Sequence, residues 1–87
     1  MRSRTTPEFW KCFDALPAEI QRLAVRAFAN WSADHHHPAL HFKRVHHIEA
    51  IWSARVGIHW RAIGRQDGDT MTWFWVGSHA DYDRLID

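Results

Sequence analysis

The spacing of apolar residues changes once along this chain of 87 residues, and the change constrains the fold more than any other feature. Up to residue 31 the apolar residues recur at helical spacing, as from Ile20 through Ala27 to Trp31. From Ile48 onward they alternate with polar residues, which is the period of a strand with one buried face. Helices followed by a block of strands predict an α+β fold, with the helices covering one face of a small, mainly antiparallel sheet.

Two helices are expected before the first strand. Thr6 is placed to cap the first helix, with Pro7 at its first position, and the pattern ends near Leu16. Pro17 starts a second, longer helix, which ends where Asp-His-His-His-Pro breaks the period within residues 32–38. We expect the two helices to form an antiparallel hairpin.

The second half of the chain is predicted to be a meander of twisted strands. Gly57 marks one turn, and Gln66-Asp-Gly-Asp69 carries the Asp-Gly signal for a tight hairpin. Residues 71–76 are apolar at nearly every position, as expected of a central strand with neighbours on both sides. By alternation, Arg55 and Arg61 lie opposite the core, and we expect their face of the sheet to be basic, concave and open.

The length of the chain suits one domain, which we expect to span residues 1–87. Apolar residues make up 46% of it, which is enough to close a core and argues against intrinsic disorder. The single cysteine, Cys12, cannot form an intrachain disulfide, and no signal-peptide pattern follows Met1. No apolar run approaches the roughly 20 residues of a membrane span. These features predict a cytoplasmic protein without a membrane segment.

Charge is segregated along the chain although the formal net charge is only +1. Residues 41–65 contain five Lys and Arg against one Glu, a local balance of +4, whereas residues 66–87 have a balance of −4. Five histidines lie within or beside the basic segment. Such a segment is either an attractive surface for phosphate groups or a solvated face without a ligand.

Four stretches, taken in order, carry a resemblance to a known family: His37 to Val45, Ile51 to Val56, Trp60 to Ile63, and Trp73 to Tyr82. With a helix hairpin first, then a meander that ends in Gly-Ser-His and a short helical turn, the chain resembles the RelE/ParE superfamily of bacterial toxins from type II toxin–antitoxin systems. The resemblance covers nearly the whole chain. The family usually begins with a strand, and none is obvious before Thr5, so that strand is either very short or missing here.

The resemblance implies a ribosome-dependent endoribonuclease that cleaves messenger RNA without a metal, inhibits translation and arrests growth. Arg61 matches the arginine that clamps the phosphate in the family's nucleases, or else is a solvated strand residue. His79 corresponds to the residue that exchanges a proton after the last strand, or else it caps the terminal helix. Tyr82 is a candidate to stack on a base or to donate a proton, or else a core anchor. His37 looks like a histidine of the YafQ-like nucleases.

Other residues of the basic segment are candidates for RNA binding beside this catalytic group: Lys43, Arg55, His41, Arg44 and Arg65. The consecutive histidines His35 to His37 also suggest a metal site, but zinc needs ligands that converge from fixed positions, usually with cysteines or acids. We therefore expect neither a metal nor another cofactor.

Two other functions stay open. A ParE-like toxin on the same fold poisons DNA gyrase by binding, without catalytic residues, and fold alone does not separate the two activities. The histidines favour the nuclease, because a binding surface has no need for titrating groups. The other alternative is an inert relic kept in the genome by its partner. The partner itself is expected to be a cognate antitoxin that covers the basic face with acidic or apolar segments.

Overall fold

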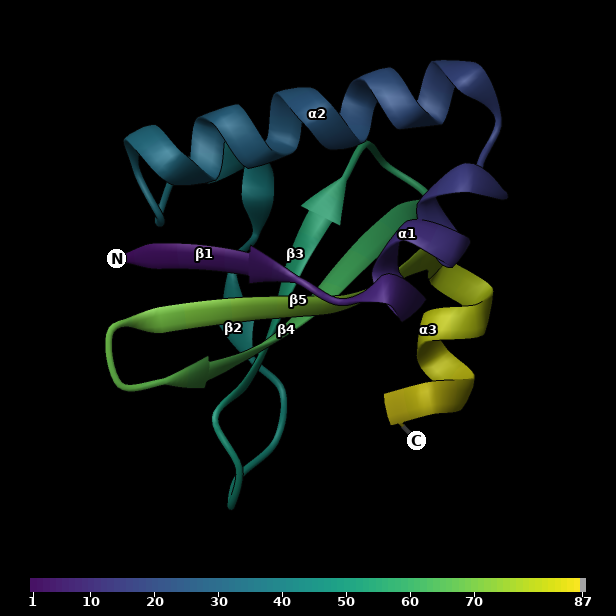
Figure 1. Cartoon of the computed structure of the whole chain (residues 1–87). Coiled ribbons are helices and arrows are strands. Elements are labelled where there is room, and N and C mark those ends of the chain that lie inside the picture. Colours follow the sequence, from purple (N-terminus) through teal and green to yellow (C-terminus); the bar gives the residue numbers. More distant parts are fainter. Residues whose placement is uncertain (87) are drawn as a thin grey trace.

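The computed structural model describes residues 1–86, which form three α-helices and a five-stranded sheet (Figure 1). In chain order the elements are β1 (Arg2–Thr5), α1 (Pro7–Asp14), α2 (Ala18–Ala33), the 3₁₀ turn η1 (Pro38–Leu40), β2 (Lys43–Arg44), β3 (Ile51–Val56), β4 (Trp60–Asp67), β5 (Thr70–Ser78) and α3 (His79–Ile86). The strand order is β1-β5-β4-β3-β2, and all neighbours are antiparallel except β1 and β5. The predicted α+β class is confirmed.

An amino-terminal strand is present and very short. β1 lies parallel to β5, with Arg2 opposite Thr70 and Thr5 opposite Trp73. Its sequence, Arg-Ser-Arg-Thr, has no apolar alternation, because all four residues are exposed at the edge of the sheet. This pairing gives β5 a neighbour on each side, as its apolar sequence predicts.

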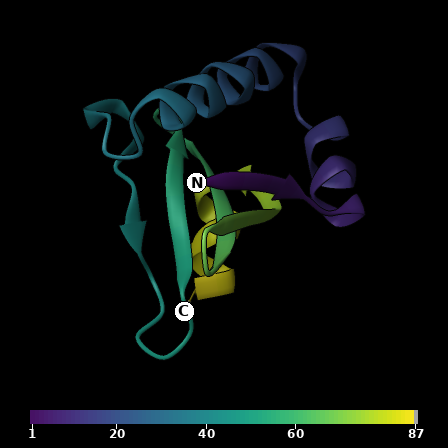
Figure 2. The same ribbon diagram turned by 60° about the vertical axis from the view of Figure 1, so that its left-hand side comes forward.

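The helices begin and end close to the predicted positions. Thr6 caps α1, because its Oγ1 accepts a hydrogen bond from the backbone N–H of Phe9 at 3.1 Å. α1 packs against β5 and α2 against β3, and α2 lies along one side of the sheet (Figures 1 and 2). We call the side that α1 and α2 cover the helix face. Its core is closed by Trp31 of α2 and Trp73 of β5, whose rings meet edge to face with centroids 5.4 Å apart.

A β-bulge explains how Trp73 and Trp75, two residues apart on β5, lie on opposite faces of the sheet. Ile63 of β4 pairs with Trp75, but the next residue, Gly64, pairs with Trp73, so Phe74 has no partner. The bulge breaks the alternation, so that Trp73 lies in the core while Trp75 is on the same face as Ile63. Gly64 makes room for this irregularity, because a Cβ there would lie 2.8 Å from both Met71 and Trp73. Sequence alternation alone does not reveal the bulge.

The sheet face opposite the helix face is not open, which corrects the prediction from the sequence. We call it the arginine face, because Arg55 and Arg61 lie on it together with Ser53 and Ile63. Ser53, Arg61 and Ile63 are buried on it. α3 packs against β4 and β5 and places Tyr82 over Arg61, and the Arg61 side chain in turn lies against Ser53. The predicted terminal turn is a helix of eight residues, which packs against β4 and β5. Within residues 1–86, no helix is both long and apolar enough to cross a lipid bilayer.

Candidate functional site

Arg61 is the centre of the arginine face. Its Nε donates a hydrogen bond to Ser53 Oγ at 2.6 Å, and one terminal nitrogen donates to the backbone oxygen of His41 at 3.3 Å. Its Cζ lies 5.1 Å from the centroid of the Tyr82 ring, at the distance of a cation–π contact. The side chain therefore connects β3, the segment before β2, and α3. The residue is only 5% exposed, so the alternative interpretation of Arg61 as a solvated strand residue is wrong.

Burial lowers the pKa of Arg61, and the neighbouring charge of Arg55 lowers it further. Tyr82 and Asp83 act in the opposite direction and raise the pKa. An arginine stays protonated in proteins despite such a shift, because its intrinsic pKa is so high. A fixed positive charge is therefore held just beneath the surface of the arginine face.

Arg55 lies directly opposite Arg61 in the register of β3 and β4. Like charges that face each other across two strands are destabilising. The salt bridges found within residues 1–86 include neither arginine. Arg55 is half-buried, and its Nη1 lies 3.4 Å from His41 Nε2. The pair thus concentrates positive charge where a bound anion would relieve the repulsion.

His79 and Tyr82 continue this group along the first turn of α3. The ring of His79 stacks on that of Tyr82, with centroids 5.7 Å apart and 22° between planes, and its Nε2 lies 3.6 Å from Asp83 Oδ2. The His79 side chain is 53% exposed. The helix cap is made by Ser78, whose Oγ accepts from the N–H of Asp81. The imidazole of His79 is therefore free of a capping role and open to solvent.

Tyr82 is buried and contacts both Arg61 and His79. Because only 5% of the residue is exposed, little of its ring is left to stack on a nucleic-acid base. The core-anchor interpretation of Tyr82 therefore fits its position. Through Tyr82, the buried charge of Arg61 and the exposed imidazole of His79 belong to one connected set of side chains.

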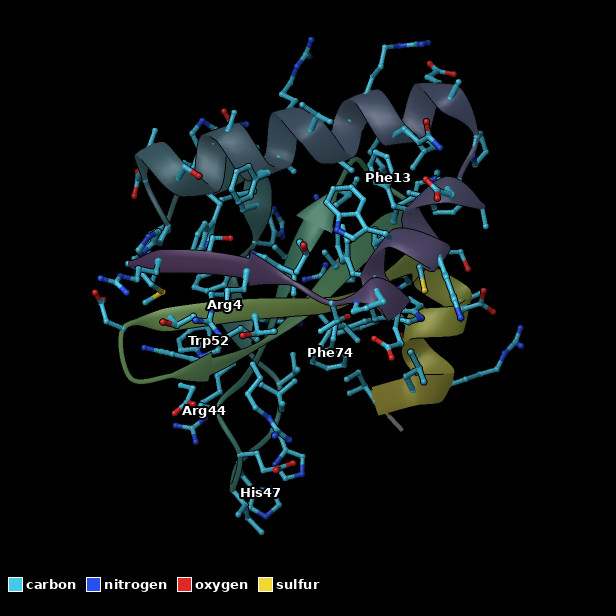
Figure 3. All side chains as sticks on the ribbon, viewed as in Figure 1. Arg4, Phe13, Arg44, His47, Trp52 and Phe74 are labelled. Carbon is cyan, nitrogen blue, oxygen red and sulfur yellow. The ribbon has the colours of Figure 1, made fainter. Side chains whose placement is uncertain are left out.

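The other predicted site residues divide into two groups. Lys43 is exposed and pairs with Ser53, which places it on the arginine face beside Arg55 and His41. Arg44 lies on β2 and donates hydrogen bonds to the backbone oxygens of His46 and Ile48, on the loop that carries His47 and projects away from α2 (Figure 3).

Two further predicted residues are engaged in local contacts. Arg65 pairs with Glu49 at 2.9 Å on the surface of the sheet. His37 caps η1, because its Nδ1 accepts from the N–H of Ala39. The structure thus brings together His41, Lys43, Arg55, Arg61, His79 and Tyr82, whereas Arg44, Arg65 and His37 have structural contacts of their own.

Two residues of this face are not identified by the sequence. Ser53 is fully buried and fixes Arg61 through its hydroxyl group. Its position directly across from Ile63, two residues from Arg61, is visible only once the strand register is known. Trp75 lies over Gly77, since a Cβ at Gly77 would be 2.6 Å from the Trp75 ring. Gly77 pairs with Arg61, so this aromatic ring is beside the arginine pair.

In the part of the chain that the structure describes, no three His, Cys, Asp or Glu side chains converge as metal ligands. The consecutive histidines point to different surroundings. His35 stacks on Trp31 with centroids 4.4 Å apart, whereas His37 caps η1. The chemistry available on the arginine face is therefore that of guanidinium, ammonium and imidazole groups.

Comparison with known proteins gives a family and a set of related folds. The family model described as a ParE-like toxin domain matches residues 18–84. The toxin–antitoxin complex RelB–RelE from Methanococcus jannaschii contains a similar chain, with a TM-score of 0.76 and 15% identity, over 97% of this chain and 99% of that one. No curated protein sequence matches.

Two other solved structures are similar. The toxin–antitoxin complex RelBE2 from Mycobacterium tuberculosis matches with a TM-score of 0.67 and 24% identity, over 88% of this chain and 95% of the other. The YoeB/ParE toxin from Agrobacterium tumefaciens matches with a TM-score of 0.70 and 15% identity, over 91% and 99% of the two chains. At these identities the likeness establishes the fold.

Proposed function

This chain belongs to the ParE-like toxin family, and from this we propose that it is the toxin of a type II toxin–antitoxin system and acts as an endoribonuclease on messenger RNA. A cognate antitoxin would hold it inactive, and its cleavage of messenger RNA on the ribosome would stop translation. The structural relatives from M. jannaschii and M. tuberculosis are toxin–antitoxin complexes, which supports an antitoxin as partner.

One observation carries the nuclease proposal: Arg55 and Arg61 face each other across two strands without an acidic partner among residues 1–86, and exposed imidazoles lie nearby. Two facing cations are costly unless an anion binds them. RNA phosphate is such an anion, and guanidinium groups can hold two of its oxygens at once. Imidazole groups beside a bound phosphate supply the proton transfers that RNA cleavage needs.

The reaction we propose is transesterification without a metal. A base removes the proton of a ribose 2′-hydroxyl, whose oxygen attacks the adjacent phosphorus and forms a 2′,3′-cyclic phosphate. The bond from phosphorus to the 5′ oxygen of the next nucleotide breaks, and an acid gives that oxygen a proton. We assign the base to His41, whose Nε2 lies by Arg55, and the acid to His79 at the start of α3.

The buried position of Arg61 changes its proposed role. Arg55 and Lys43 are accessible, so they are assigned direct contacts with the phosphate. Arg61 is a positioning residue, because it holds the backbone of His41 on one side and Tyr82, under His79, on the other. Its charge adds to the local potential that stabilises the transition state.

A gyrase poison is the alternative function. The matching family model bears the name ParE-like, and Arg61 and Tyr82 are less accessible than a direct catalytic role for them requires. In that case the arginine face would bind a protein–DNA complex through charge alone, and the histidines would have no part in chemistry.

The experiment that tests the proposal adds the purified protein to ribosomes programmed with a messenger RNA and maps cuts by primer extension. The Arg55→Ala protein should lose at least about a hundredfold in cleavage rate, the scale of losing one positioned charge in a site. Arg26→Ala removes the same charge from the exposed surface of α2 and should cleave like wild type. Inhibition of gyrase supercoiling without cuts in the messenger would exclude the nuclease and support the alternative.

A further inference from the structure

Trp75 brings a large aromatic ring to the arginine face, where the proposed reaction has no role for it. Simple alternation from Trp73, which lies in the core, would place Trp75 in the core as well. The extra residue at Phe74 reverses its direction, so that Trp75 pairs with Ile63 on the arginine face. Bulges of this kind re-aim a side chain and are common beside functional sites. The irregularity of β5 therefore presents an indole ring on the basic side of the sheet.

Gly77 gives this ring a bare stretch of backbone to lie on. A Cβ at Gly77 would be 2.6 Å from Cζ2 of Trp75 and 2.9 Å from Cη2, so the indole extends along β5 over this glycine. The glycines with positive φ within residues 1–86 are Gly57 and Gly68, so the backbone at Gly77 does not itself require glycine. The missing side chain makes room for the ring, and it does so directly beside Arg61, the strand partner of Gly77.

Part of the Trp75 side chain stays accessible to another molecule. The residue is half-buried, and the aromatic pairs described for residues 1–86 do not include it. The indole nitrogens that are buried without a partner belong to Trp31, Trp52 and Trp73. The indole hydrogen bond described for these residues is that of Trp10. The N–H of Trp75 is therefore accessible to solvent and not used within the described part of the chain.

Accessible cations lie across the same face from this ring. Arg55 is on β3 and Gly77, under the Trp75 ring, is on β5, so two strand spacings, about 10 Å, separate them. Lys43 adds an exposed cation on β2. Proteins that hold single-stranded nucleic acid combine cations, which follow the phosphates, with aromatic rings on which bases stack. The arginine face has both parts, close enough for one short segment of RNA to contact them together.

The positions of the assigned base and acid decide which nucleotide meets Trp75. His41, the assigned base, lies beside Arg55 of β3 and acts on the nucleotide that carries the attacking 2′-hydroxyl. His79, the assigned acid, follows directly after β5 and gives its proton to the 5′ oxygen of the next nucleotide. The RNA therefore crosses the sheet from β3 toward β5 in the direction of its 3′ end. Trp75, on β5, is on the side of the leaving nucleotide.

We propose that Trp75 stacks on the base of the nucleotide immediately 3′ to the cut and makes the enzyme prefer a purine there. A purine has the larger ring system and covers more of the indole, so it gains more from stacking. The inference rests on the proposed nuclease function, because that function supplies the RNA and its direction. Trp75 thus determines where the RNA is cut and takes no part in the proton transfers.

The test uses the full chain and ribosomes programmed with messengers whose cut site is mapped by primer extension. The messengers differ only in the nucleotide 3′ to the cut, which carries a purine, a pyrimidine or no base. Stacking of one base on an aromatic ring corresponds to about fivefold to 150-fold in affinity. The wild-type chain should therefore cleave the purine messenger at least about fivefold faster than the abasic one, with the pyrimidine messenger between them.

Variants of Trp75 separate stacking from packing. Trp75→Leu keeps an apolar side chain but removes the aromatic face, so it should cleave the three messengers at rates within about twofold of one another. Trp75→Phe keeps a smaller ring and should keep part of the preference. Trp10→Leu makes the same change at a tryptophan on α1 that is 47% exposed, and it should keep the wild-type preference. A purely structural role for Trp75 predicts slower cleavage of all three messengers with the ratios unchanged.

Photocrosslinking of the wild-type chain gives an answer that does not depend on any variant folding. A messenger with 5-iodouridine 3′ to the cut, and with a 2′-O-methyl group that blocks the attacking hydroxyl, should crosslink to the peptide that contains Trp75. A crosslink to another residue, or wild-type ratios in Trp75→Leu, would overturn the inference while the nuclease proposal stands. If the wild-type chain leaves every programmed messenger uncut, the proposed function itself fails.

Discussion

Replacing Arg61 with alanine should destabilise the protein far more than replacing Arg55, although the two arginines face each other on neighbouring strands. Arg61→Ala leaves the Ser53 hydroxyl, which is fully buried, without its partner, at a cost of about 1–3 kcal/mol. It also removes the contact with Tyr82, worth about 0.5–2 kcal/mol. The variant no longer has to bury a cation, and this offsets part of the lost stability. We expect Arg61→Ala to lower the free energy of unfolding by about 2–4 kcal/mol in total.

Urea unfolding followed by tryptophan fluorescence measures the effect. A chain of this size has an m-value near the low end of about 1–3 kcal/mol per molar urea, so the midpoint should fall by about 2 M. Arg55→Ala is the matched control. It removes an equal charge from a half-buried site and relieves the repulsion with Arg61, so its midpoint should stay within about 0.5 M of wild type.

A midpoint for Arg61→Ala within about 0.5 M of wild type would refute this reasoning and show that Arg61 is a solvated residue. The double variant Arg61→Met with Ser53→Ala separates stability from activity. Removing both side-chain partners together leaves no buried side chain unpaired, although the backbone oxygen of His41 loses its bond, so most of the lost stability should return. A stable double variant that still does not cleave RNA would assign the loss to the charge of Arg61 and its hold on the His41 backbone, not to unfolding.

Three further predictions follow from single positions. His79→Ala should keep the wild-type unfolding midpoint, because the side chain is 53% exposed, but lose about 10²- to 10⁴-fold in RNA cleavage; a folded, fully active variant contradicts the acid role. Gly77→Ala should cost about 1–3 kcal/mol, measured by urea unfolding, because the added Cβ meets the Trp75 ring at 2.6 Å. Trp73→Ala should fail to fold or lose about 3–5 kcal/mol, seen by circular dichroism, against a total of roughly 5–10.

The helices and hairpins of this fold are predictable because their signals are local. Thr6 and Pro7 mark the start of α1, and the Asp-Gly pair at residues 67–68 marks a turn whose Gly68 has φ of 59°. β1 and the bulge at Phe74 are not predictable in this way. β1 depends on its pairing with β5, about 70 residues away, and the bulge depends on how β5 pairs with β4. No local sequence pattern encodes either pairing.

In the candidate site, the sequence likewise predicts which face of the sheet a residue lies on, but not how deeply it is buried. Alternation places Arg55 and Arg61 correctly on the face opposite the helices. It cannot distinguish a solvated arginine from a buried one, because the difference depends on where α3 packs. The sequence after Ser78 reads as a short turn, whereas its eight residues form a helix that covers Arg61 through Tyr82. Exposure is therefore a tertiary property here, and it is the reason why the roles we propose for the two arginines differ from those expected from the sequence.

The contacts of Arg61 determine how a loss of toxicity in Arg61 and Tyr82 variants is interpreted. Arg61 supports both the packing of α3, through Tyr82, and the proposed reaction centre, through the backbone of His41. A variant of Arg61 or Tyr82 that is no longer toxic is therefore explained equally well by lost structure and by lost chemistry. Arg55 supports no packing of this kind, since the hydrogen bond described for its side chain within residues 1–86 is the 3.4 Å approach to His41. Loss of activity in a stable Arg55 variant can therefore be assigned to the arginine face itself. A stable His79 variant then separates a nuclease from a binding toxin on this fold, because only the nuclease needs the imidazole for proton transfer.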